Sequence, residues 1–388
     1  MSGKAVNVTE ENWKAEFYAS PLFQSTFTRF YPHSDFFSIA HEDLGTFDYS
    51  IITHHNLLQS GFSYHDSSQI ETDHDEELLE KYVEIIHGGS DIELWNKETF
   101  VFNGASVSDK KIKLSVSDFY SALSISTKLI LEIFNAFEEV LANKSQELIT
   151  EEAVIDVTSS PEFFLPLREK SFSSISEILA NASKHNRPIG GTYLTAVKDS
   201  TGKINILVGS RSDNLTSWPS RRTIFPAGYM QPDTLKPFSK GLSFQHMADE
   251  FSREVFNVAE DVPASSNVRT EGIDQLLRSG DAVFENTGFG FSADVLNAEC
   301  SGLLYIDDPE YTDYLLNNIE QNYEHTGVSA IPIEMLYDKS VFEDIFHPYN
   351  ITPTSAFAFY NGLKELEKHT DSSSVTNLLD KLEYKNYD

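Results

Sequence analysis

The residues best suited to chemistry lie between positions 245 and 261. Glu250 and Glu254 are four residues apart, and Asn257 and Asp261 continue a helical spacing. Such positions share one face of a helix, so the four side chains are predicted to form a stripe. Carboxylate and amide oxygens are ligands that Mg²⁺ and Mn²⁺ accept, and the stripe predicts a divalent-metal site. In a chain with 60 acidic residues, an acidic stripe is also typical of a solvated helix face, and this interpretation is slightly favoured.

A second group of candidate residues precedes this helix. Arg211, Arg221 and Arg222 flank a loop that leads into Gly228 and Tyr229. The planar guanidinium group of arginine suits phosphate oxygens, and a tyrosine ring can stack on a base. We therefore predict that these five residues bind an anionic ligand. The alternative is that the arginines pair with surface carboxylates, which is their commoner role.

The elements around these residues follow a defined order. The patterns at 191–198 and 204–212 predict two strands joined by a glycine-containing turn. A Pro-Ala-Gly turn and the acidic helix come next. This order resembles the Nudix fold, whose members cleave nucleoside diphosphates linked to another moiety. Arg253, Glu254 and Val255 match the Arg-Glu-aliphatic part of the family signature.

The sequence departs from that signature at several positions. Asn257 and Val258 stand where the family has glutamate, and Glu260 replaces its final glycine. Counting back from Arg253, the first glutamate of the signature falls on Gln245. Two of the expected metal-ligand carboxylates are therefore missing from the helix.

The resemblance implies two competing functions. The first is a metal-dependent hydrolase, in which Glu254 and Glu250 hold Mg²⁺ or Mn²⁺ while water attacks a phosphoanhydride of a nucleoside diphosphate derivative. The second is a weakly catalytic or non-catalytic protein that binds such a small molecule or a related effector, and the missing carboxylates favour it slightly. In both cases Arg253 is implied to be a structural brace that pairs with a carboxylate. A scaffold for assembly is a third interpretation.

The composition argues against other classes of function. The chain has 388 residues with 29 basic and 60 acidic side chains, which gives a formal net charge of −31. Because nucleic acids and anionic membranes attract Lys and Arg, neither is an expected partner. The single cysteine, Cys300, excludes intramolecular disulfides and is predicted to be a buried core thiol. The sequence shows no secretory signal and no apolar segment long enough to span a bilayer, so a soluble cytoplasmic protein is expected.

We predict an α/β (α+β) fold with a mixed sheet flanked by helices, divided into three parts. Residues 1–180 would form an α+β domain that covers the pocket or binds a protein partner. Residues 181–370 would form the Nudix-like domain. Residues 371–388 would be a charged tail that docks on a partner or frays.

Local patterns complete the expected architecture. Apolar periodicity predicts a helix over 118–142, and Thr352 with Pro353 predicts the start of another. The segment 285–291 is predicted to be a turn into 292–296, and 301–307 is predicted to be a strand that completes the sheet. The segment 59–77 is predicted to be an exposed loop. A solvated loop is favoured over a metal site for the histidines and acids in or near 59–77, namely His54, His55, His65, Asp66, Asp73, His74 and Asp75.

Overall fold

A parallel pair of strands, β8 (Arg187–Lys198) and β13 (Ala298–Ile306), forms the centre of the main sheet. Successive residues of β8 alternate between two hydrophobic cores, with Tyr193 in one and Leu194 in the other. This alternation is expected of a strand that is covered on both faces. The structure is a computed structural model that describes residues 5–31, 35–58, 63–69, 75–87, 96–212, 218, 220–232, 241–259, 268–320, 322 and 324–385.

The remaining strands extend the sheet on both sides of this pair. Its main path is β15 (Leu382–Tyr384), β2 (Phe36–His41), β3 (Gly45–Ile52), β12 (Ala282–Ser292), β13, β8, β5 (Glu98–Ser106), β6 (Lys111–Asp118) and β4 (Ser63–Gln69). Pairing with β8 are β9 (Ile204–Arg211) and β11 (Ala227–Tyr229), and pairing with β9 are β10 (Arg222–Ile224) and β14 (His325–Pro332). A separate small sheet contains β1 (Val6–Asn7) and β7 (Leu148–Ile149).

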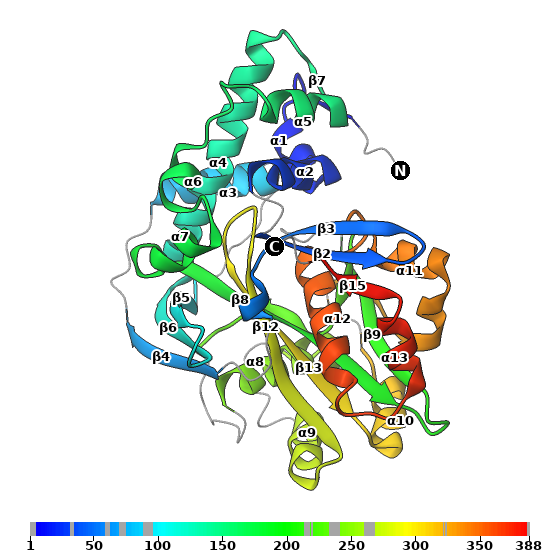
Figure 1. Cartoon of the computed structure of the whole chain (residues 1–388). Helices are drawn as coiled ribbons and strands as arrows, with labels where there is room; N and C mark the ends of the chain where they lie inside the picture. The colour runs from blue at the N-terminus through cyan, green and yellow to red at the C-terminus, as the bar shows by residue number, and fades with distance from the viewer. Residues whose placement is uncertain are drawn as a thin grey trace.

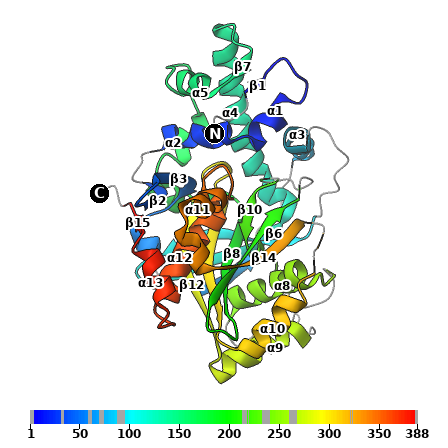
Figure 2. The ribbon, with the colours of Figure 1, turned by 90° about the vertical axis from the view of Figure 1, so that its right-hand side faces the viewer.

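Helices cover both faces of the main sheet (Figure 2). One face is covered by α8 (Leu242–Phe256), α9 (Val268–Ser279) and α10 (Pro309–Asn317). The opposite face is covered by α11 (Lys339–Phe346), α12 (Pro353–Leu366) and α13 (Ser373–Leu379). This arrangement confirms the predicted α/β fold with a mixed sheet flanked by helices.

The N-terminal helices gather at one end of the sheet (Figure 1). They are α1 (Trp13–Ala19), α2 (Pro21–Phe30), α3 (Glu76–His87), α4 (Phe119–Asn143), α5 (Glu151–Thr158), α6 (Pro166–Ser171) and α7 (Ile175–Ala180). The helix predicted over 118–142 is α4, and the side chain of Asp118 caps it by accepting from the amide of Ser121. In the described part of the chain, no helix is long and apolar enough to cross a membrane.

Segments from both ends of the chain belong to the main sheet. β3 pairs with β12, with Ile52 opposite Phe291, and β15 pairs with β2, with Leu382 opposite His41. Val375 of α13 is fully buried in the core beneath β15. The predicted division at residues 180 and 370 stays a prediction, while strand pairing and core packing cross both positions.

Two local predictions are wrong, and in both a strand replaces a loop. The segment 285–291 lies within β12, which bulges between Asn286 and Gly288. A Cβ atom on Gly290 would lie 3.0 Å from the carbonyl oxygen of Ile52, so this glycine permits close strand approach and makes no turn. The predicted loop 59–77 contains β4, because a polar segment can pair with the distant β6. The strand at 301–306 and the helix from Pro353 are confirmed.

Candidate ligand-binding site

A cavity of about 460 Å³ lies where the short strand β11, helix α8 and the N-terminal helices meet. This volume is within the range of small-molecule sites in proteins. Among the described residues, the charged groups on its wall are Arg211, Arg253, Glu250, Asp294, Glu299 and Glu324. The aromatic rings on its wall are those of Tyr18, Tyr82, Trp218 and Tyr229.

Glycines allow two of these carboxylates to approach the strands of the cavity floor. β11 pairs antiparallel with β8, which puts Gly228 opposite Gly191. A Cβ atom on Gly228 would lie 2.5 Å from Cδ of Glu250, and one on Gly190 would lie 2.9 Å from Oε2 of Glu299. A larger residue at either glycine would have to displace the carboxylate. The glycines of the floor therefore leave the space that these two carboxylates occupy.

The lone cysteine lies directly beside this floor. The thiol of Cys300 donates a hydrogen bond of 2.8 Å to the carbonyl oxygen of Gly190. Its side chain is buried, as the sequence predicts, and burial raises the pKa of the thiol to about 12. Cys300 is therefore protonated and unreactive at neutral pH in the folded protein.

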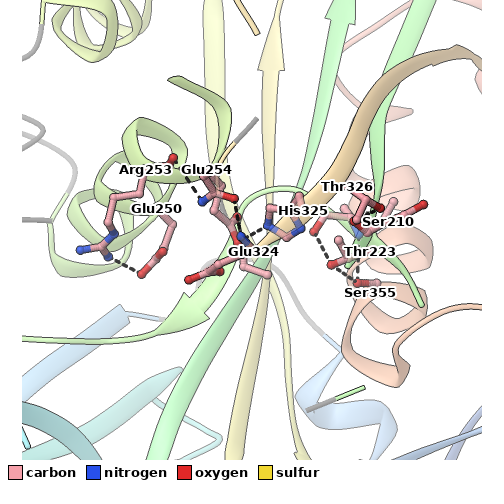
Figure 3. A network of polar contacts seen from close by, with 12 residues as sticks. Ser210, Thr223, Glu250, Arg253, Glu254, Glu324, His325, Thr326 and Ser355 are labelled. Atoms are coloured by element: carbon pink, nitrogen blue, oxygen red, sulfur yellow. Dashed lines mark hydrogen bonds and ion pairs between the residues drawn. The ribbon is translucent and has the colours of Figure 1, made fainter. Parts of the chain in front are cut away.

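Helix α8 presents Glu250 and Arg253 to the cavity. Its apolar residues Phe251 and Val255 are buried against the sheet, which fixes the rotation of the helix about its axis. The guanidinium group of Arg253 donates to Oε1 of Glu250, as Figure 3 shows. This pair supports the brace expected for Arg253, and both of its members are within reach of a ligand.

Glu254 lies behind the cavity wall and contacts the protein alone. It is 1% exposed and is not among the residues that line the cavity. Its Oε2 accepts a hydrogen bond of 2.8 Å from the amide of Ala227, and its Oε1 is 2.9 Å from Nε2 of His325. In Figure 3, Glu254 points toward His325, whereas Glu250 points toward Arg253. Both oxygens of Glu254 thus hold β11 and β14 in place.

Burial sets the protonation of this buried pair. Burial raises the pKa of Glu254 well above its ordinary value, and the negative charge of Glu324 raises it further. Burial lowers the pKa of His325 to about 4. Burial therefore favours the uncharged form of each group, and with it a neutral hydrogen bond between them.

Within the described residues, one acid and histidine group has the spacing of a metal site. Ligand atoms of Glu254, Glu324 and His325 lie within 4.8 Å of one another. A cation fits this group poorly, because Glu254 already accepts from Ala227 and its carboxyl favours the protonated state. Glu324 is the member that also lines the cavity.

The predicted acidic stripe ends earlier than expected. α8 stops at Phe256, and Asn257 adopts the left-handed conformation with φ of 51°. Asparagine tolerates this conformation, which terminates the helix and turns the chain along the cavity wall. Asn257 lines the cavity without continuing the helical face that carries Glu250 and Glu254. Asp261 lies outside the described residues, as do Asp73 and His74, and its role as a metal ligand stays a prediction.

The structure separates the three arginines of the predicted anion site. Arg211 lines the cavity beside Glu324. Arg221 is buried, donates to the carbonyl oxygen of Pro348 and stacks on Trp218, with 4.6 Å between the guanidinium carbon and the ring centroid. Arg222 donates to Ser210 and lies 3.4 Å from Asp344 at the surface. Neither Arg221 nor Arg222 lines the cavity. Arg221 supports the indole ring of Trp218, and Trp218 does line the cavity.

Burial also reduces the negative charge of the cavity. It raises the pKa of Glu250 to about 8 and raises the pKa values of Asp294 and Glu299 above their ordinary range. At neutral pH Glu250 therefore favours its uncharged form, and burial disfavours the charged forms of Asp294 and Glu299, whereas arginine stays charged. The cavity is accordingly less acidic than its composition indicates, and it can accept an anion beside Arg211 and Arg253.

Sequence reasoning missed several residues of this cavity. Glu324 precedes β14, Asp294 lies between β12 and β13, and Tyr18 belongs to α1. Each reaches the cavity by long-range packing, so no local motif marks it. The alternation of β13 is a weak signal for Glu299, because an acid in an otherwise apolar strand suggests a special environment.

Comparisons with known proteins identify no family for this chain. No protein-family model matches it, and no curated protein sequence matches it significantly. Solved structures that match part of it include an Ap4A hydrolase from C. elegans, with 13% identity, 45% of this chain and 96% of that chain covered, and a TM-score of 0.25. Another is a Nudix hydrolase from Alicyclobacillus acidocaldarius, with 10% identity, 47% and 96% coverage, and a TM-score of 0.28. Because these TM-scores are low, the matches carry no argument about function.

Proposed function

We propose that the protein binds a diphosphate-containing nucleotide derivative in this cavity, through a Nudix-like domain with a degenerate metal site. The observation that carries the proposal is the position of Glu254. It is buried, hydrogen-bonded to Ala227 and His325, and absent from the cavity wall. A carboxyl so placed supports the architecture of a binding site and contributes little to holding a catalytic cation.

The cavity wall supports this choice of ligand. Arg211 and Arg253 offer planar donor groups to phosphate oxygens. The rings of Trp218 and Tyr229 offer apolar faces to a base or sugar. The protonated state of Glu250 near neutral pH removes a charge that would repel a diphosphate from Arg253.

A metal-dependent hydrolase is the second candidate, and the Glu254, Glu324 and His325 group favours it. In that case a divalent cation would be held mainly by Glu324 and His325, with Glu250 beside the phosphates. The cation would supply charge neutralisation at the attacked phosphorus.

Calorimetric titration with nucleoside diphosphate derivatives, with and without Mg²⁺ or Mn²⁺, followed by chromatography of each mixture, separates these candidates. We expect binding that persists in a chelator and yields no monophosphate. Arg211→Ala should weaken it tenfold or more, whereas substitution of the exposed Glu139 by glutamine should leave it unchanged. A monophosphate that forms with metal and is lost in Glu324→Gln would establish the hydrolase instead.

A further inference from the structure

One end of the cavity is built by segments outside the predicted Nudix-like part. Tyr18 of α1 and Tyr82 of α3 line it, as does Ser50 of β3. Figure 1 shows these helices at the end of the sheet that β3 and the β12 to β13 connection also reach. The two halves of the chain thus supply different walls of one cavity, with the arginines on the side of α8 and β9.

Polar groups at this end lack partners within the protein. The hydroxyl of Ser50 is on a residue only 3% exposed, yet it makes no hydrogen bond within the described structure. Among described residues, none donates a hydrogen bond to the carboxylate of Glu299. Leaving buried polar groups unpaired is costly, so these groups are prepared for a ligand that supplies hydrogen bonds.

Other polar contacts hold the surrounding rings in place. The hydroxyl of Tyr18 donates to Oδ2 of Asp294 over 3.3 Å. The amide of Asn297 donates to the hydroxyl of Tyr229 over 2.9 Å, and Ser126 of α4 donates to Asn297 over 3.1 Å. Fixed aromatic rings beside unpaired acceptors are the features that recognise a planar heterocycle with N–H donors.

We propose that this end of the cavity is a base-recognition subsite for guanine, with Glu299 as the residue that reads the base. The assignment rests on the proposed function and names its ligand as a guanosine diphosphate derivative. The Watson–Crick edge of guanine carries a ring N–H beside an exocyclic amino group, which together match the two oxygens of a carboxylate. Adenine lacks the ring N–H and pairs with a carboxylate through its amino group alone.

The protonation of Glu299 provides a distinctive signature. Burial raises the pKa of Glu299 well above its ordinary value, and nearby Asp294 raises it further. Two donors from guanine would favour the ionised carboxylate and lower that pKa. Binding of the base should therefore release protons over the pH range in which Glu299 is protonated in the free protein, which a purely structural glutamate would not do.

The test is titration of the full-length protein with GDP, ADP, UDP and inorganic pyrophosphate in two buffers of different ionisation enthalpy. We expect GDP to bind at least tenfold more tightly than ADP, with a net release of protons. Glu299→Gln should abolish both the preference and the proton release while the affinity for pyrophosphate is unchanged. Tyr82→Leu should weaken the binding of nucleotides and leave the affinity for pyrophosphate unchanged. The control Tyr314→Leu, at an exposed tyrosine, should change neither affinity.

The outcomes distinguish this assignment from the proposed function. Equal affinity for the three nucleoside diphosphates, with pyrophosphate also bound, would overturn the guanine subsite and leave the diphosphate site standing. Retention of a GDP preference by Glu299→Gln, shown by thermal melting to be folded, would also overturn it. Failure of every nucleotide and of pyrophosphate to bind would overturn the proposed function and this assignment together.

Discussion

Two glutamates one helical turn apart have different environments. Glu250 lies against Gly228 and contacts Arg253 on the cavity wall, whereas Glu254 is enclosed between β11 and β14. The sequence resemblance points to Glu254 as the important acid, whereas both of its oxygens contact the protein. The residue that lines the cavity is Glu250, whose pKa is raised to about 8.

Substitution of Glu254 tests whether its carboxyl is neutral. A protonated carboxyl both donates and accepts, so glutamine can reproduce its contacts with His325 and Ala227. We expect Glu254→Gln to change the free energy of unfolding little, and Glu254→Ala to lower it by about 1–3 kcal/mol because Ala227 loses its acceptor. Urea unfolding measures both. Equal destabilisation by the two variants would mean that the folded protein needs the charged form.

The pH dependence of anion binding tests Glu250. Its pKa is raised to about 8, so it is uncharged below that pH and negative above it. We expect the affinity for pyrophosphate to fall as the pH rises through about 8, because a new charge then faces the ligand beside Arg253. In Glu250→Gln that fall should be absent, while Glu139→Gln should behave as the unaltered protein. Calorimetry between pH 6 and 9 provides the comparison, and parallel curves for all three proteins would rule out this role.

At the scale of elements, local sequence patterns predicted the strands and helices whose formation depends on neighbouring residues. The strands β8 and β9 follow from apolar spacing, the long helix α4 from apolar spacing and its Asp118 cap, and the start of α12 from Pro353 in its first turn. The periodicity of α8 predicts a helix that continues through Asn257. The helix ends before it, because Asn257 adopts a left-handed backbone conformation that the side-chain pattern does not indicate. The pairing of β12 with β3 was missed because glycines that permit close packing resemble glycines in turns.

The helix end at Asn257 can be tested directly. Its φ of 51° is accessible to asparagine and glycine but strained for alanine. We expect Asn257→Ala to lower the free energy of unfolding by about 1 kcal/mol, and Asn257→Gly to leave it nearly unchanged. Urea unfolding of the two variants measures the difference. If alanine is tolerated as well as glycine, α8 extends beyond Phe256 in solution, and the predicted stripe with Asp261 regains support.

At the scale of the whole molecule, the cavity depends on both halves of the chain. Tyr18 and Tyr82 come from the N-terminal helices, and Arg211 and Glu250 come from the segment that resembles the Nudix fold. Comparing the chain with a single family could therefore locate only one side of the cavity. The other side depends on strand pairings between distant segments, which sequence spacing does not encode.

The C-terminal segment is expected to be integral to the fold. Val375 and Leu378 of α13 and Leu382 of β15 are buried, and β15 pairs with β2. Removing residues 371–388 should lower the free energy of unfolding by about 5 kcal/mol, because three apolar side chains lose their burial. Thermal and urea unfolding measure the loss, with removal of 386–388 alone as the control. A truncated protein as stable as the full chain would instead support the prediction that this segment is a frayed tail.

The buried thiol of Cys300 makes the cavity floor observable without any added label. Because this is the only cysteine and it bonds to Gly190 next to Glu299, a thiol reagent can react only when that part of the sheet opens. The rate of modification would then report the local opening free energy at the ligand's position. An occupied cavity should slow that reaction, so the modification rate of Cys300 reports whether the site holds a ligand.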